Sequence, residues 1–250
     1  MIKHHTHNGV AHIQIARLEK KNAITTAMYQ TMADAINAAV ADDAVRSILL
    51  YGEPAIFTAG NDLEDFAKSK PATDIAESLK TPVFQFMRAL HTCYKPVVVA
   101  VTGAAVGIGT TLLMHVDLVY LADNAKLTMP FVKLGLCAEF ASSLLIPQTA
   151  GWARAAEALL LGEAILPADA VAMGIATRVL PAADVLAYAT AKAEAFNQIP
   201  ADGVRTTKRL MRKAVHGEVL PVIANEGAEF GRLLQTPAAQ AAFAAFLGKK

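Results

Sequence analysis

The sequence predicts an α/β fold, because strand-like runs, glycine-bearing turns and helix-like segments alternate along its first half. Two observations carry this prediction. The run 97–101 is wholly apolar, as in a strand that is buried on both faces of a sheet. The glycine-bearing turns 57–63 and 103–109 each follow an apolar run and each open a helical pattern. Repeated strand–turn–helix units imply a parallel sheet with right-handed crossovers.

The individual elements follow from the periodicity of apolar residues. Residues 10–16 alternate apolar and polar side chains, as a half-buried strand does. A helix follows, with Thr25 or Thr26 as its N-cap, and it ends at Asp42 and Asp43. The same criteria predict strands at 47–51, 97–101, 118–121, 126–129 and 176–180, and helices at 63–68, 82–93 and through 112–115.

Beyond residue 141 the pattern is almost wholly helical and ends in segments at 204–215, 220–234 and 238–247. One finished core cannot cover every apolar face of such a tail, so we expect it to dock on a second subunit. We therefore divide the chain into a core at 1–199 and a helical oligomerisation region at 200–250. Trp152, which follows a glycine, is expected in the core. The apolar stripes of the tail carry Phe230, Phe243 and Phe246.

The bulk properties exclude several classes of protein. The chain has 250 residues, 54% of them hydrophobic, and a formal net charge of +1, so its charge favours neither nucleic acid nor an anionic membrane. No apolar run is long enough to span a bilayer, and the first residues lack the apolar region of a secretory signal. Two cysteines provide no disulfide framework and no metal-ligand spacing. His5 and His7 share one strand face, which is too few ligands for a metal site. We expect a cytoplasmic protein without a metal.

The two glycine turns suggest an oxyanion hole. Glycine removes the Cβ that would block close approach, and the first residues of a helix leave N–H groups without intrahelical acceptors. Both turns can therefore aim donors at a developing negative charge. Two other interpretations remain for the turn 103–109. It could bind a dinucleotide, although Leu112 stands where the third glycine belongs, or it could serve packing alone.

Glu139 is the only acidic residue in the stretch 133–143, which has no other charge beyond Lys133. An isolated carboxylate among apolar residues suits proton transfer. It could equally cap a helix that starts near Phe140, because acidic residues are favoured at helix N-termini. Asp62 is expected to cap the helix after the first glycine turn.

Several short motifs, taken in their order and separation, resemble the crotonase (enoyl-CoA hydratase/isomerase) superfamily over nearly the whole chain. The resemblance implies a crotonase-like spiral of β-β-α units with a C-terminal helical region that builds homotrimers or dimers of trimers. It also implies an acyl-CoA thioester substrate, with coenzyme A present only as part of that substrate and no other cofactor. The motifs lie at residues 20–24, 57–63, 95–109, 117–118, 130–135, 168–176 and 246–250.

The same resemblance assigns roles to single residues. The two oxyanion donors fall on the backbone N–H groups of Asn61 and Ile108. The two carboxylates of true hydratases would fall at Thr111 and Phe131, where this chain has no carboxylate. Glu139 stands where a group of Δ3,Δ2-enoyl-CoA isomerases has its single catalytic glutamate.

Further positions are implied to contact the substrate. Backbone groups near Lys20, Lys21 and Ala59 would meet the adenine and pantetheine portions of coenzyme A. Phe246 and Lys249 would reach the coenzyme A site of a neighbouring subunit. Where hydratases often have a lysine, this chain has Glu64. The remaining implied contacts are Gly60, Leu63, Gly107, Thr111 and Phe131.

The chemistry favours an isomerase that acts in fatty acid or related acyl-CoA metabolism. Hydration needs groups that orient water, deprotonate it and protonate the α-carbon, and two carboxylates usually share these tasks. A double-bond shift needs one carboxylate that takes a proton from C2 and returns it to C4. Two alternatives remain: a hydratase or another crotonase-type lyase or hydrolase, and a protein that binds coenzyme A thioesters without catalysis.

Overall fold

The computed structural model describes residues 1–68, 77 and 79–247. Its main sheet has six strands in the order β1-β2-β3-β4-β6-β8, and a separate parallel pair joins β5 to β7. Only β1 runs antiparallel to its neighbour within the main sheet, so the prediction of a largely parallel α/β sheet is confirmed. The strands are β1 (Ile2–His7), β2 (Val10–Ile15), β3 (Ser47–Tyr51), β4 (Val97–Val101), β5 (Ala104–Val106), β6 (Leu118–Ala122), β7 (Lys126–Thr128) and β8 (Arg178–Leu180).

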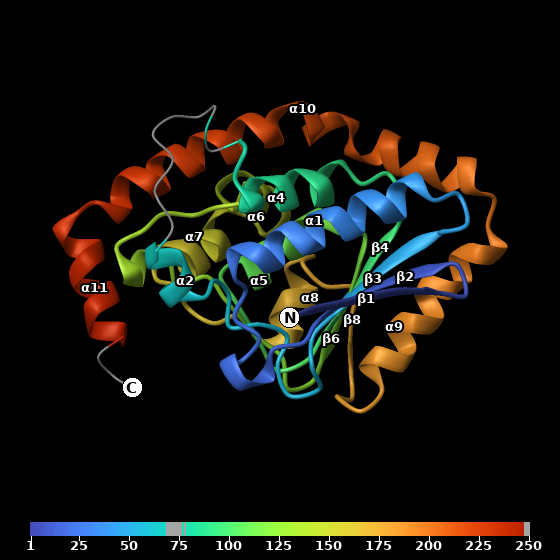
Figure 1. Cartoon of the computed structure of the whole chain (residues 1–250), viewed down its shortest axis with the longest axis horizontal. Coiled ribbons are helices and arrows are strands. Elements are labelled where there is room, and N and C mark those ends of the chain that lie inside the picture. Colours follow the sequence, from blue (N-terminus) through green and yellow to red (C-terminus); the bar gives the residue numbers. More distant parts are fainter. Residues whose placement is uncertain (69–76, 78, 248–250) are drawn as a thin grey trace.

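Strand β4 is buried on both faces, as its sequence predicts. Val97, Val99 and Val101 belong to the larger core, which α1 (Thr26–Ala41) and α4 (Pro82–Thr92) cover. Val98 and Ala100 face a second core under α9 (Val185–Glu194), on the other side of the sheet (Figure 1). The period of two along a strand thus divides the apolar residues between two layers. The remaining α-helices are α2 (Leu63–Lys68), α5 (Ile108–Thr111), α6 (Ser142–Ala150), α7 (Trp152–Leu160), α8 (Pro167–Ala172), α10 (Ala201–Leu234) and α11 (Pro237–Leu247).

The residues predicted to begin helix α1 do so in the structure. The Thr25 hydroxyl accepts a hydrogen bond from the Met28 N–H and caps α1. The turn 103–109 contains a feature that its sequence does not show. Three of its residues form β5, which pairs with β7.

Helix α10 runs unbroken across the length of the molecule in Figure 1. The prediction of two segments on either side of residues 216–219 is therefore wrong. Pro221 stands inside the helix, where it costs one backbone hydrogen bond. Val219 and Ile223, which flank the proline, are both buried, and this packing keeps the helix continuous. None of the helices within the described ranges is both long and apolar enough to cross a bilayer.

Charged side chains fasten α10 to the core. The Lys208 ammonium donates to the Lys95 carbonyl at 2.7 Å and to the Asp117 carboxylate at 2.6 Å. Arg212 donates to the carbonyls of His91 and His115 at 2.9 and 2.7 Å. These contacts fix the position of a helix whose later residues reach the candidate site described below.

Three apolar side chains differ from expectation. Trp152 is 77% exposed rather than in the core, because it begins α7 on the outer surface of the chain. Phe230 and Phe243 pack against the larger core of their own chain, so they do not require a second subunit. The Phe246 side chain lies outside the described residues. The homotrimer or dimer of trimers, like the division of the chain at residue 200, stays a prediction.

We expect Lys208→Met to lower the free energy of unfolding by about 2–4 kcal/mol, because it removes the nearer of two charge partners of Asp117 and a donor to a buried carbonyl. Chemical denaturation measures this loss. Lys213→Met is the matched control, since Lys213 is an exposed lysine on the same helix. Equal stability of the two variants would contradict the anchoring role of Lys208.

Candidate active site

A cavity of about 530 Å³ lies between the two glycine turns. One wall carries Asn61 and the other carries Ile108, the two expected oxyanion donors. Of the other expected contact residues, Thr111 does not line this cavity. Its described lining comprises Glu19, Lys20, Lys21, Ala23, Ala59, Gly60, Asn61, Asp62, Leu63, Glu64, Gly107, Ile108, Pro130, Phe131, Leu134, Leu136, Phe230 and Phe243.

The Asn61 N–H faces the cavity, because the flanking residues Gly60 and Asp62 make their backbone hydrogen bonds to Ile24 on the opposite side of the chain. The Ile24 N–H donates to the Gly60 carbonyl at 2.8 Å, and the Asp62 N–H donates to the Ile24 carbonyl at 2.9 Å. In such a parallel bridge the N–H of the residue between them points away from the partner strand. Gly60 has φ +86°, and a Cβ there would lie 2.7 Å from the Val106 carbonyl oxygen, so only glycine fits.

The Ile108 N–H is the first of helix α5, where an N–H has no intrahelical acceptor. Gly107 precedes it with φ +56° and accepts the N–H groups of Thr110 and Thr111 at its carbonyl. Within the described ranges, the N–H groups of Asn61 and Ile108 donate to no other backbone group. Both are therefore available to a ligand oxygen.

A direct link between the turns fixes the separation of these two donors. Thr58 and Ala105 form a parallel bridge, in which the Thr58 N–H donates to the Ala104 carbonyl and the Val106 N–H to the Thr58 carbonyl, both at 3.0 Å. Each donor residue lies three positions after a member of this bridge. The two turns thus form one rigid unit.

Glu139 lies behind the Ile108 wall. The Thr111 hydroxyl, one helical turn after Ile108, donates to Glu139 Oε1 at 2.5 Å. Glu139 is 7% exposed and does not line the cavity. Burial raises the pKa of Glu139 to about 8, with a smaller contribution from the nearby Glu226 carboxylate, while the Thr111 hydrogen bond opposes the rise.

Tyr29 binds the other donor residue, Asn61, and lies close enough to Glu139 to be affected by its charge. It projects from α1, is fully buried, and donates its hydroxyl to Asn61 Oδ1 at 2.5 Å. Burial and the neighbouring Glu139 charge raise the pKa of Tyr29 well above its usual value, so it stays a donor. Glu139 therefore lies near both donor residues. Sequence reasoning placed Tyr29 nowhere in the site, because its position in the helix marks it only as core.

Glu226, on α10, is a second site residue that the sequence did not reveal. Its Oε2 accepts the Ala141 N–H at 2.5 Å, and its Oε1 accepts the Ser143 N–H at 3.0 Å and the Ser143 hydroxyl at 2.5 Å. These are the donors at the start of α6. The alternative in which Glu139 caps that helix is therefore wrong, because Glu226 caps it instead.

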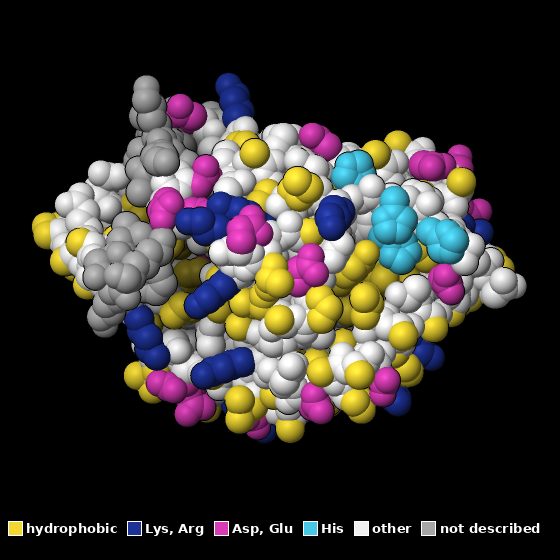
Figure 2. Space-filling model, turned by 60° about the horizontal axis from the view of Figure 1, so that its bottom comes forward, with side chains coloured by type: hydrophobic (Ala, Val, Ile, Leu, Met, Phe, Trp, Pro, Cys, Tyr) yellow, Lys and Arg dark blue, Asp and Glu magenta, His cyan; other side chains and the backbone are white. Residues whose placement is uncertain are grey.

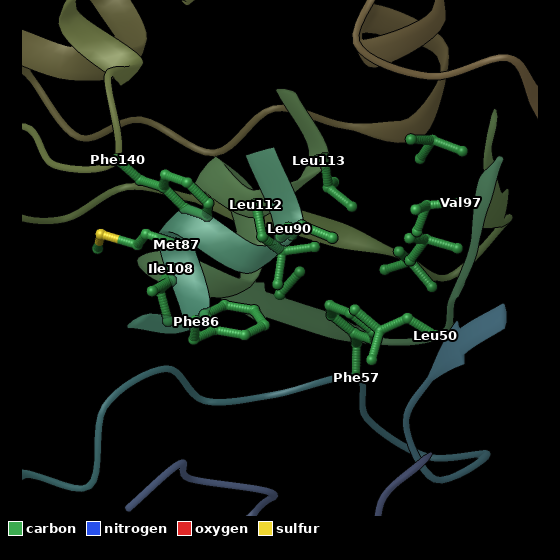
Figure 3. Packing of buried hydrophobic residues seen from close by; sticks show 14 of the residues in the cluster. Leu50, Phe57, Phe86, Met87, Leu90, Val97, Ile108, Leu112, Leu113 and Phe140 are labelled. Atoms are coloured by element: carbon green, nitrogen blue, oxygen red, sulfur yellow. The ribbon is translucent and has the colours of Figure 1, made fainter. Parts of the chain in front are cut away.

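A histidine pair holds the other side of the same segment. His115 Nε2 donates to the Phe140 carbonyl at 2.8 Å, and the His115 ring stacks on Phe140 with centroids 3.7 Å apart. Burial lowers the pKa of His115 to about 3, so the ring is neutral and its Nδ1 accepts from His91 Nδ1 at 3.2 Å. Figure 3 shows Phe140 at the same end of the core as Ile108 and Phe86.

Charged residues surround the opening of the cavity. Asp62 accepts the N–H groups of Glu64 and Asp65, both at 3.0 Å, and pairs with Arg17 at 2.5 Å, which confirms its capping role. Lys20 lies 3.7 Å from Glu64, and both side chains are exposed. Lys249 lies outside the described residues.

The histidine side chains that are visible in Figure 2 gather in one patch of the surface. His5 stacks on His12 with ring centroids 4.7 Å apart. Across the described part of the chain, no three His, Cys, Asp or Glu side chains are grouped so that they could hold a metal ion.

Comparisons with known proteins agree with this geometry. The enoyl-CoA hydratase/isomerase family matches residues 5–250. Human enoyl-CoA delta isomerase 2 is 33% identical over 223 residues, which cover 88% of this chain and 56% of the human protein. The chain spans about half the length of several curated relatives that it matches.

Solved structures confirm the crotonase-like fold. The structure of OdaA from Pseudomonas aeruginosa has a TM-score of 0.94 at 44% identity and covers 98% of both chains. An enoyl-CoA hydratase/isomerase from Pseudoalteromonas atlantica T6c has a TM-score of 0.92 at 34% identity, over 100% of this chain and 97% of that chain.

The raised pKa of Glu139 makes stability depend on pH. The folded state binds this proton more tightly than the unfolded state, so the stability that Glu139 contributes is complete below the unfolded pKa of about 4.3 and falls as pH rises toward about 8. We expect Glu139→Gln to gain Tm relative to the unmodified protein as pH rises from 5 to 8. Thermal unfolding at a series of pH values measures the difference, with the exposed Glu229→Gln as control. A difference that does not change with pH would contradict the buried, protonated carboxyl.

Proposed function

Because this chain belongs to the enoyl-CoA hydratase/isomerase family of the crotonase superfamily, we propose that it is an acyl-CoA double-bond isomerase, which converts 3-enoyl thioesters to 2-enoyl thioesters. One observation carries the proposal. The buried carboxyl of Glu139 accepts a hydrogen bond from Thr111, which lies one helical turn after Ile108, and both Ile108 and Asn61 line one cavity.

The reaction uses three groups of this chain. Glu139 takes a proton from C2 of the 3-enoyl thioester, and the C2–H electron pair moves into the conjugated system as negative charge develops on the thioester oxygen. The N–H groups of Asn61 and Ile108 bind that oxygen, and each contributes roughly 3–4 kcal/mol to lowering the barrier. Glu139 then returns the proton to C4, which leaves the double bond between C2 and C3. No water or second acid is consumed.

A carboxyl with a pKa of about 8 suits this exchange. It is a stronger base than an exposed glutamate, and its pKa lies near the operating pH, where a proton can be taken and returned. In the structure the Glu139 carboxylate accepts a hydrogen bond from Thr111 and does not line the cavity. The proposal therefore includes a rotation of the Glu139 side chain toward the bound thioester.

The cavity suits the two ends of such a substrate. Phe131, Phe230 and Phe243 form an apolar part of its lining, where we place the acyl chain. Lys20 and Lys21 lie in the same lining, where we place the adenine and pantetheine portions of coenzyme A.

The hydrogen bonds and ion pairs of the neighbouring carboxylates disfavour a hydratase. At the two positions implied for hydratase carboxylates, Thr111 donates to Glu139 and Phe131 forms the cavity wall. Glu226 is occupied by three donors at the start of α6. Asp62 in the cavity lining is held by Arg17 and two N–H groups. None of these groups is placed to activate a water molecule opposite Glu139.

We expect Glu139→Gln to lower kcat for 3-hexenoyl-CoA by about 100- to 10,000-fold, because it removes the proton acceptor and keeps the shape. The Kd for the thioester should stay within about tenfold of its original value. Steady-state kinetics and calorimetry measure the two quantities, and Glu229→Gln should change neither. Turnover near the original rate in Glu139→Gln would exclude the mechanism.

Isomerisation of 3-hexenoyl-CoA should be much faster than hydration of crotonyl-CoA, since Thr111 and Phe131 stand at the two positions implied for the hydratase carboxylates. Initial rates on both substrates decide this. Faster hydration would favour the hydratase, and tight thioester binding without turnover of either substrate would favour a protein that only binds coenzyme A thioesters.

A further inference from the structure

We propose that Glu226 of α10 is a positioning residue for Glu139: it holds the segment 139–143 in the one conformation that directs the Glu139 carboxyl toward Thr111 and the cavity wall. This inference rests on the role proposed above for Glu139. It gives the C-terminal helix a part in the chemistry, although Glu226 touches no substrate.

The segment needs such support because its backbone is strained. Phe140 and Ala141 are consecutive non-glycine residues with φ of +54°, in the left-handed region that side chains disfavour. Conformations of this kind persist only where the surroundings over-determine them, and they concentrate at functional sites. Both residues come directly after Glu139, so a relaxation here would move its carboxyl.

Glu226 makes most of the hydrogen bonds that hold the backbone of this segment on one side. Its two carboxylate oxygens accept three hydrogen bonds, two from backbone N–H groups and one from the Ser143 hydroxyl. The carboxylate is only 6% exposed, so these bonds are not shared with bulk water. Cys137 adds a weaker contact, since its thiol donates to the Glu226 backbone carbonyl at 3.8 Å.

The opposite side of the segment is held through the same helix. His115 binds the Phe140 carbonyl, and Arg212 of α10 binds the His115 carbonyl at 2.7 Å. Helix α10 therefore contacts the segment directly at Glu226 and indirectly through His115. Glu226 and Arg212, both on α10, thus restrict the position of Glu139.

The charge of Glu226 provides a readout besides activity, because it also acts on the acidity of Glu139. The groups that face Glu139 are Tyr29 from α1, Thr111 from α5 and Glu226 from α10, while neutral His115 packs on the adjoining Phe140. Among them Glu226 is the like charge, and it raises the pKa of Glu139. Removing that charge should therefore lower this pKa.

Glu226→Gln is the main test. Glutamine keeps the volume, but its NH2 group would face an N–H or hydroxyl donor, so one side of the clamp is lost. We expect kcat for 3-hexenoyl-CoA to fall about tenfold with KM within about threefold, because the base is displaced while the binding surface is intact. We also expect the pKa of Glu139, measured by ¹³C NMR of its carboxyl, to fall.

Glu229→Gln is the matched control, since it removes an exposed carboxylate from the same helix, three residues further on, and should change neither quantity. Ser143→Ala removes one of the three donors and keeps both charges. It should lower kcat by about two- to fivefold without lowering the pKa of Glu139.

Unchanged kcat and unchanged Glu139 pKa in folded Glu226→Gln would overturn the proposal. If Glu226→Gln does not fold, an unchanged kcat in Ser143→Ala overturns it instead. The NMR titration separates this result from a failure of the proposed function. A protein that turns over no 3-enoyl thioester would refute the isomerase, whereas the dependence of the Glu139 pKa on Glu226 would still be measured.

Discussion

The cost of burying one carboxyl is the constraint on which the candidate site depends. Glu139 is nearly inaccessible to water, and the loss of hydration raises its pKa to about 8. The single Thr111 hydrogen bond offsets this loss only in part. The same desolvation that lowers stability at neutral and alkaline pH makes the carboxyl a stronger base. Function and instability therefore have one physical cause.

The remaining parts of the structure hold this carboxyl beside two fixed dipoles. The sheet delivers the two glycine turns to one edge, and the bridge between Thr58 and Ala105 links them. Backbone N–H groups placed in this way need no reorganisation when negative charge develops on a substrate. Helix α10 fastens to the core through Lys208 and Arg212 and reaches the Glu139 segment with Glu226. A long C-terminal helix thus stabilises the fold and shapes the site.

Local patterns in the sequence predicted most of the strands, the N-cap at Thr25 and both glycine turns, because these features depend on neighbouring residues, but they did not predict β5. The resemblance added roles for Asn61, Ile108 and Glu139. Tyr29 and Glu226 could not be found in this way, since each meets its partner across 32 or more residues of chain and carries no local motif. The predicted break at residues 216–219 is absent, because burial of Val219 and Ile223 keeps α10 continuous through Pro221. Trp152 misled the core prediction because hydrophobicity alone does not say which face of a short helix is covered.

The central claim is that one water-excluded carboxyl carries the same proton from C2 to C4. The most direct measurement is a single turnover of 3-hexenoyl-CoA in D2O with enzyme in excess, followed by mass spectrometry and NMR of the 2-enoyl product. The account predicts that most product molecules retain a substrate-derived hydrogen at C4, because the buried Glu139 exchanges little with solvent while the dienolate is bound. Incorporation of one deuterium at C4 in every molecule would contradict it.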